Sequence, residues 1–386
     1  CARLAQFQDT MLMMLRTDKP SRRCAINGRF LAQPMTGVQR YAYEIVSALD
    51  AILSTEPDAA LAFSLVVPPQ TRHPIDLQRI ELVRTTFGSG HVWDQITLPR
   101  HAADVGLNLA NFGPLLARRQ IVCIHDANTF VVPDSYSRKF GLAYRTLLPI
   151  MGRMAARVAT VSQFSADMLV KFGVTRRDKI FIAPNGHEHV LRWDSARARL
   201  PILQQLTRPY VLLLGSTAKH KNVDVIIRQA DALDAAGIDI LVAGGAFSIF
   251  ASDGPAATRR NVHHLGFVED DQLAALYEGA LCLVFPSKTE GFGIPPLEAM
   301  AKGCPVISSN AASLTEVGGD AVLYVAPDDG QGWRDAIIRL SQAPDLRRSL
   351  SAQGRKRAEL FSWKRSADLY LNELLRLATS RPTPSV

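Results

Sequence analysis

The segment FPSKTEGFGIPPLEAMAKGCPV, residues 285–306, decides the fold. The apolar run at 280–286 ends in proline and predicts a buried strand. Pro296 suits the first position of a helix, and Gly303, which is soon followed by another proline, is a helix stop signal. The pattern therefore predicts a strand, a glycine-rich loop and a short helix that carries Glu298 in its first turn.

Two glutamates, Glu290 and Glu298, flank this loop. Such a loop presents free backbone N–H groups and the positive end of a helix dipole to one point, which suits a phosphate or a sugar hydroxyl. Glu290 at the loop mouth is free to accept hydroxyl protons. The alternative is an ordinary strand–loop–helix unit with a solvated Glu290 and a capping Glu298. The Gly-Phe-Gly-Ile-Pro interior favours the ligand site.

Composition limits the class of protein. The chain has 386 residues, enough for two domains, with 47% apolar and 21% charged residues, as in soluble globular proteins. The net charge of +8 suggests an anionic partner, namely a nucleotide, a phospholipid surface or nucleic acid. The five cysteines form no C-x-x-C pair, which predicts reduced, buried thiols in a cytoplasmic protein. Residues 1–22 resemble a poorly specified leader, and 379–386 are predicted to be disordered.

Strands alternate with helices along the first half of the chain, which predicts a parallel sheet. The buried strand at 120–126 ends in His125 and Asp126, and polar residues at the carboxyl end of a parallel strand point into the ligand-binding crevice. The alternative for His125 is a hydrogen-bonded histidine at a strand end. Asp126 either orients His125 or serves a second substrate.

A basic amphipathic helix is predicted at 138–157. It either lies on an anionic membrane or is an ordinary surface helix. Beyond it, His187 and His189 alternate next to a turn, and surface histidines are predicted there instead of a metal pair. Residues 187–207 are the predicted linker to a second unit that opens with the strand at 210–215.

Taken together, these motifs resemble glycosyltransferase family 4, the retaining glycosyltransferases with a GT-B fold and a Glu-x7-Glu signature. The resemblance implies an α/β protein with two Rossmann-like β/α/β domains facing across a cleft. Residues 1–200 would be the acceptor-binding domain and 201–364 the nucleotide-sugar-binding domain, with a helix at 365–378 crossing back to the first domain.

The resemblance also implies roles for single residues. Glu290 would face the donor sugar with His125 nearby, and Glu298 would hold the ribose. Lys221 matches the family's donor-phosphate loop, although the arginine that relatives carry is missing and Lys219 is the only nearby cation. The implied catalytic residues are His125 and Glu290, and the candidate acceptor residues are Asp126 and Arg40. The implied donor-site residues are Gly37, Ser216, Lys219, Lys221, Gly266, Phe267, Val268, Phe292, Gly293, Ile294 and Glu298.

The activity implied is metal-independent transfer of a hexose with retention, by same-face substitution and without a cofactor. The patterns Asn27-Gly-Arg-Phe and Thr36-Gly-Val resemble mannosyltransferases and rhamnosyltransferases of O-antigen pathways. GDP-mannose is therefore the expected donor and a growing, lipid-linked cell-surface glycan the expected acceptor, with no nucleic acid partner. The expected location is the cytoplasm, with attachment to the inner face of the plasma membrane left open. The alternatives are a GT-B sugar-nucleotide epimerase or phosphorylase, and a catalytically silent basic protein that binds anionic glycan or membrane.

Overall fold

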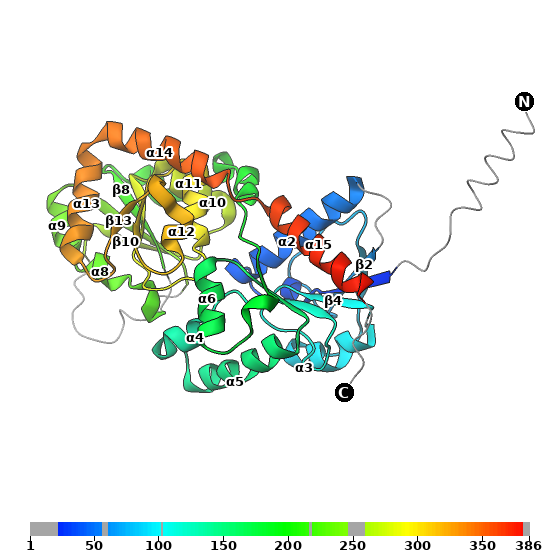
Figure 1. Cartoon of the computed structure of the whole chain (residues 1–386). Helices are drawn as coiled ribbons and strands as arrows, with labels where there is room; N and C mark the ends of the chain where they lie inside the picture. The colour runs from blue at the N-terminus through cyan, green and yellow to red at the C-terminus, as the bar shows by residue number, and fades with distance from the viewer. Residues whose placement is uncertain (1–21, 56–60, 102, 216–217, 246–258, 381–386) are drawn as a thin grey trace, which may run out of the picture.

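The computed structural model of the chain describes residues 22–55, 61–101, 103–215, 218–245 and 259–380 (Figure 1). The predicted leader lies outside these residues except for Arg22, which opens the first strand. Ser216 also lies outside them, as does the end of the predicted disordered tail, residues 381–386.

The first sheet contains seven parallel strands in the order β3-β2-β1-β4-β5-β6-β7. Its strands are β1 Arg22–Asn27, β2 Leu61–Val67, β3 Glu81–Arg84, β4 Val105–Asn108, β5 Gln120–Cys123, β6 Arg157–Thr160 and β7 Ile180–Ile182. Cys24 of β1 pairs with Phe63 on one side and with Val105 on the other. Central strands read as continuous apolar runs because helices cover both faces of the sheet. This sheet and its helices form the N-terminal domain.

The second sheet contains six parallel strands in the order β10-β9-β8-β11-β12-β13 and forms the C-terminal domain. Its strands are β8 Tyr210–Leu214, β9 Asp239–Ala243, β10 Val262–Gly266, β11 Cys282–Phe285, β12 Val306–Ser309 and β13 Leu323–Val325. The predicted α/β class with two Rossmann-like domains is confirmed.

Helices pack on both sheets. The described α-helices are α2 Gly37–Thr55, α3 Gly90–Val92, α4 Asn128–Val131, α5 Arg138–Met154, α6 Gln163–Lys171, α7 Pro201–Gln205, α8 Asp224–Ile227, α9 Ala230–Ala235, α10 Asp270–Gly279, α11 Ile294–Lys302, α12 Leu314–Gly318, α13 Gly330–Gln342, α14 Pro344–Ala358 and α15 Trp363–Thr379. None of these helices combines the length and the apolarity needed to cross a membrane.

The last helix, α15, leaves the C-terminal domain and packs beside α2 of the N-terminal domain (Figure 1). The Tyr370 and Tyr41 hydroxyl oxygens lie 3.0 Å apart, and the Tyr41 hydroxyl also lies 2.9 Å from the Ala183 carbonyl. All three residues are fully buried. The contact ties the end of the chain to the first sheet.

Two local predictions are wrong. Helix α11 begins at Ile294, two residues before Pro296, so Glu298 lies in its second turn and not in its first. The first turn tolerates both prolines because its N–H groups have no partner within the helix. His189 is not a surface residue, since it is fully buried. The prediction of reduced, buried thiols is confirmed for the four described cysteines. They are free and buried: Cys24, Cys123, Cys282 and Cys304.

Candidate active site

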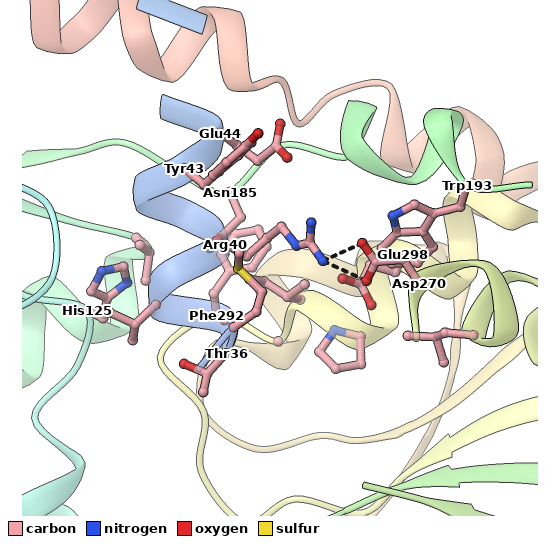
Figure 2. A pocket seen from close by; sticks show the side chains of 18 of the residues that line it. Thr36, Arg40, Tyr43, Glu44, His125, Asn185, Trp193, Asp270, Phe292 and Glu298 are labelled. Atoms are coloured by element: carbon pink, nitrogen blue, oxygen red, sulfur yellow. Dashed lines mark hydrogen bonds and ion pairs between the residues drawn. The ribbon is translucent and has the colours of Figure 1, made fainter. Parts of the chain in front are cut away.

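A cavity of about 940 Å³ opens where strands of both sheets end (Figure 2). His125 lies just beyond β5 and Glu290 just beyond β11, so the two domains supply opposite walls. The predicted residues that line the cavity are Gly37, Arg40, His125, Asp126, Lys221, Phe267, Val268, Glu290, Phe292, Gly293, Ile294 and Glu298.

Two predicted donor-site residues, Lys219 and Gly266, do not belong to this lining. Lys219 begins the short 3-10 segment η8 Lys219–Lys221 and is exposed. Gly266 ends β10 with a φ of +67°, a backbone conformation that favours glycine. The turn at Gly266 leads into Phe267, which lines the cavity and is 76% exposed.

Lys221 and Glu290 form an ion pair in the cavity. The Lys221 Nζ lies 2.7 Å from the Glu290 Oε1, and the two side chains are 25% and 12% exposed. Nζ also lies 5.6 Å from the centre of the Phe285 ring, which provides a cation–π contact. The predicted phosphate-binding cation and the predicted sugar-binding carboxylate are therefore each other's partners.

Serine hydroxyls hold the loop between the two glutamates. The Ser313 hydroxyl lies 2.9 Å from both the Glu290 and the Phe292 carbonyls. Ser162 and Ser165 at the start of α6 donate to the Gly291 carbonyl at 2.6 and 3.0 Å. In a trans peptide the N–H points away from the preceding C=O. Fixing these carbonyls therefore also fixes the direction of the N–H groups in the loop.

The start of α11 offers few backbone donors. The first four N–H groups of a helix have no partner within it, but two of those positions are Pro295 and Pro296, which carry no N–H. Gly293, the N-cap, and Ile294 therefore supply the free donors of this turn, since the Leu297 N–H is the first to bond within the helix. Gly293 has a φ of +100°, which favours glycine. The anion-binding capacity of this turn is confined to a small, defined set of N–H groups.

Gly291 marks the closest approach of the two domains. A Cβ atom at this position would lie 2.8 Å from the His125 carbonyl oxygen and 3.0 Å from the Asp126 Cβ. The backbone of the C-terminal domain thus lies against the end of β5 because residue 291 has no side chain.

His125 is almost fully buried, at 6% exposure. Its Nε2 lies 2.9 Å from the Leu109 carbonyl, which can only accept, so Nε2 carries the proton and Nδ1 does not. The Tyr41 ring packs edge-on against the imidazole at 4.8 Å. Burial lowers the pKa of His125 to about 4, against the effect of the Leu109 hydrogen bond. The imidazole is therefore neutral near pH 7.

The two candidate acceptor residues are held differently. Burial raises the pKa of Asp126, although its carboxylate accepts a hydrogen bond from the backbone N–H of Asn128 at 2.8 Å. Arg40 instead reaches across the cavity, and its Nη2 lies 2.6 Å from both carboxylate oxygens of Asp270 on α10 (Figure 2). Asp126 therefore lines the cavity without an ion-pair partner among the described residues, whereas Arg40 already joins the two domains.

Glu298 is held by side chains from other parts of the chain. Its Oε1 lies 3.0 Å from the His189 Nε2, and its Oε2 accepts from the Tyr277 hydroxyl at 3.0 Å. The Trp363 indole N–H donates to the His189 Nδ1 at 3.1 Å. Glu298 lines the cavity, but only 8% of its side chain is exposed.

Outside the cavity, a carboxylate of the C-terminal domain contacts the N-terminal domain. Glu316 of α12 accepts hydrogen bonds from the backbone N–H groups of Gln163 and Phe164 at 2.8 and 2.7 Å. These amides belong to the first turn of α6, whose N-cap is Ser162. The C-terminal domain therefore caps a helix of the N-terminal domain, which favours the approach seen at Gly291.

Several residues of the site were not predicted. They are His189 and Tyr277 next to Glu298, Asp270 opposite Arg40, and the lining residues Asn185 and Trp193 (Figure 2). Only Asn185 carried a signal, since it follows the last strand of the first sheet. No group of three His, Cys, Asp or Glu side chains among the described residues could hold a metal ion.

Known proteins share this sequence pattern and this fold. Residues 196–357 match the family described as "Glycosyl transferases group 1". The O-antigen chain mannosyltransferase RfbU of Salmonella typhimurium is 33% identical over 235 residues, 60% of this chain and 63% of RfbU, less than two thirds of that relative. The O-antigen chain mannosyltransferase B of Escherichia coli is 26% identical over 366 residues, 88% of this chain and 96% of that protein.

Solved structures confirm the fold. Sucrose-phosphate synthase from Thermosynechococcus elongatus superposes with a TM-score of 0.66 at 21% identity, over 92% of this chain and 98% of that one. WaaG, a glycosyltransferase involved in lipopolysaccharide biosynthesis, gives a TM-score of 0.63 at 18% identity, over 91% of this chain and 99% of WaaG. Residues 196–357 of this chain are therefore similar to the group 1 glycosyl transferases, and the whole chain has the two-domain GT-B fold of these solved structures.

Proposed function

We propose that this protein transfers a hexose from a nucleotide sugar to a growing glycan with retention at the sugar carbon, and that the donor is GDP-mannose. The observation that carries the proposal is that four predicted site residues line the same cavity: Lys221, Glu290, Glu298 and His125. The names of RfbU and of the second O-antigen mannosyltransferase support mannose as the sugar. A lipid-linked acceptor is part of the same proposal.

The Lys221–Glu290 ion pair gives a route for donor binding. A diphosphate carries more negative charge than one carboxylate, so it competes for the Lys221 ammonium group. Once Lys221 turns to the phosphates, Glu290 is free to accept hydrogen bonds from sugar hydroxyls. The N–H groups of Gly293 and Ile294 add to the stabilisation of the leaving phosphate. These protein groups supply the positive charge, which is why we propose that no metal or other cofactor is needed.

The substitution occurs on one face of the sugar. The bond between the anomeric carbon and the phosphate oxygen breaks, the acceptor oxygen forms the new bond on the same face, and the acceptor proton passes to the leaving phosphate. Glu290 is occupied with positioning, and burial disfavours the ionised, nucleophilic form of Asp126. Neither carboxyl group is then required to form a covalent intermediate. Asp126 instead orients the acceptor hydroxyl.

The test is a binding titration with GDP, UDP, dTDP and their sugars. Lys221→Ala is expected to weaken the binding of the preferred nucleoside diphosphate about ten- to a hundredfold, as for loss of a charged hydrogen bond. Binding of the bare nucleoside should not change. Lys219→Ala is the matched control, because this neighbouring lysine is outside the cavity lining.

Two of the alternative functions predict different outcomes. If no nucleotide binds, a silent binding protein for anionic glycan or membrane becomes the favoured function. If a nucleotide sugar binds and is converted to its epimer without an acceptor, the chain is an epimerase.

We also propose that α5 attaches the protein to an anionic membrane surface. Phe140, Leu142 and Ile150 are 41%, 65% and 42% exposed on this helix. Its exposed basic residues are Arg138, Lys139, Arg145 and Arg153. A helix with apolar and basic side chains exposed together favours an anionic bilayer surface.

Sedimentation with vesicles of phosphatidylglycerol, compared with phosphatidylcholine, tests this attachment. The double variant Phe140→Ser, Leu142→Ser is expected to lose the bound fraction. Leu360→Ser, which removes a 55% exposed leucine between α14 and α15, should leave it unchanged. Equal binding by both variants would rule out α5 as the attachment surface.

A further inference from the structure

Three buried side chains beyond the cavity determine how Glu298 is presented to it. They come from three separate segments: His189 from η6 Glu188–Arg192, Tyr277 from α10 and Trp363 from the start of α15. None of the three lines the cavity, whereas Glu298 does. Any effect they have on a bound ligand must therefore pass through the Glu298 carboxylate.

The direction of each hydrogen bond in this group follows from the chemistry of its atoms. An indole N–H can only donate, so the His189 Nδ1, 3.1 Å from the Trp363 Nε1, accepts and carries no proton. The proton of the neutral imidazole is then on Nε2, which donates to the Glu298 Oε1 at 3.0 Å. Trp363 thereby fixes the tautomer of His189, and His189 fixes one carboxylate oxygen.

Tyr277 fixes the other carboxylate oxygen. Its hydroxyl lies 3.0 Å from the Glu298 Oε2. The Tyr277 side chain is fully buried, and burial next to Glu298 keeps the phenol protonated and therefore a donor. Both donors are neutral, so neither hydrogen bond to Glu298 is an ion pair.

Glu298 still has unused acceptor capacity. An ionised carboxylate has about four lone-pair sites, and His189 and Tyr277 use one on each oxygen. One site remains on each oxygen, and the two oxygens of a carboxylate are close enough to accept from two neighbouring hydroxyl groups. A vicinal diol, such as the 2′,3′-diol of a ribose, matches this arrangement.

We propose that His189 and Tyr277 are positioning residues that aim Glu298 at the ribose diol of the donor nucleotide, and that Trp363 supports them by fixing the His189 tautomer. The inference rests on the proposed function, since it assigns a nucleotide to the cavity. Its consequence is selectivity: a site whose buried acceptors are fixed in place discriminates against a ligand that lacks the matching hydroxyl.

The experiment measures the dissociation constants of GDP, 2′-deoxy-GDP and 3′-deoxy-GDP, or of the corresponding uridine compounds if UDP is the nucleotide that binds. The wild-type protein should bind each deoxy compound about tenfold more weakly than the ribose form. Tyr277→Phe, which keeps the ring, and His189→Ala should reduce that ratio to about two- or threefold. His189→Gln retains an N–H donor and should recover part of the ratio.

Matched controls separate positioning from a merely structural role. Tyr210→Phe removes another buried phenol, which donates to the Leu276 carbonyl at 2.9 Å and does not contact Glu298. His187→Ala removes the neighbouring histidine, whose Nδ1 lies 2.7 Å from the Phe361 carbonyl. Both controls should keep the wild-type ratio between ribose and deoxy compounds, even where they lower thermal stability.

The outcomes distinguish this inference from the proposed function. If the wild type binds GDP and Lys221→Ala weakens that binding, but Tyr277→Phe and His189→Ala keep the full ratio, the positioning role is wrong and the proposed function stands. A wild type that binds ribose and deoxy compounds equally also refutes the positioning role. If the wild type binds no nucleoside diphosphate, both proposals fail.

Discussion

Glu290 and Glu298, the two glutamates of the Glu-x7-Glu segment, are the same type of residue but have different surroundings. Glu290 faces a lysine within the cavity, in a contact between two opposite charges. Among the described residues, Glu298 accepts hydrogen bonds from two neutral donors, both of them buried. An ion pair at a cavity wall can exchange one partner for a ligand, whereas a carboxylate held by neutral donors keeps its orientation when a ligand arrives. The segment therefore combines one carboxylate that can exchange its ion-pair partner for a ligand with one whose orientation is fixed before a ligand binds.

Removing the charge of Glu290 should have the largest effect. Glu290→Gln keeps the size of the side chain but releases Lys221, so GDP should bind as tightly as before or more tightly. Turnover should fall about 10²- to 10³-fold, the usual loss when one polar group that positions the reacting centre is removed. The measurement is kcat of mannosyl transfer together with the dissociation constant of GDP.

Glu298→Gln is the comparison variant for this prediction. It should weaken GDP binding in addition to its effect on turnover, because its carboxylate is the one proposed to contact the ribose. Similar behaviour of the two variants in both measurements would show that the difference in surroundings has no functional meaning.

The pH dependence of stability should show how strongly the folded protein disfavours protonation of His125 in the cavity wall. The pKa of His125 falls from 6.5 to about 4 on folding, so between these values the unfolded chain binds more protons than the folded one. His125 therefore lowers the free energy of unfolding as pH falls from 6.5 towards 4, by about 3 kcal/mol in total. Its contribution becomes constant about one pH unit above 6.5.

The His125→Asn variant isolates this effect. Other groups also titrate in the same range, so the quantity to follow is the difference in unfolding free energy between wild type and variant, measured with urea. That difference should shrink by about 3 kcal/mol from pH 6.5 to pH 4. A difference that does not depend on pH would mean that the imidazole becomes charged in the folded protein.

Glu316 should give the smallest effect, and it tests whether any carboxylate near the cleft behaves like Glu290. Glu316→Gln weakens the cap on α6 and should cost about 1 kcal/mol of stability. GDP binding should change less than threefold, because Glu316 does not line the cavity. Thermal unfolding and the same GDP titration measure both quantities. A loss of turnover as large as that of Glu290→Gln would show that closure of the domains matters as much as the cavity charges.

Local patterns in the sequence predicted the parts of the site that are local in the chain. The strand–loop–helix unit with Glu290, the strand that precedes His125 and the turn with Lys221 each depend on a few neighbouring residues. Their arrangement around one cavity follows from the parallel sheets, because the loops at the carboxyl ends of the strands meet there.

Contacts between distant segments could not be predicted in this way. His189 is hidden because α15 returns to the first domain and Trp363 reaches it, which no pattern around residue 189 indicates. The Arg40–Asp270 pair joins residues 230 positions apart and depends on how the domains face each other. The early start of α11 was missed for a simpler reason, since two adjacent prolines are compatible with more than one position in a first turn.

The return of α15 has a consequence for building hybrid enzymes. The segment that matches the glycosyltransferase family ends at residue 357, but the indole that orders the Glu298 group is Trp363. The same helix is bonded through Tyr370 to Tyr41 in the other domain. A C-terminal domain transplanted with its boundary at the family match would leave behind the residue that completes the proposed nucleotide site. If that proposal is correct, donor specificity will be transferred only when the crossing helix and the face of α2 that receives it are exchanged together.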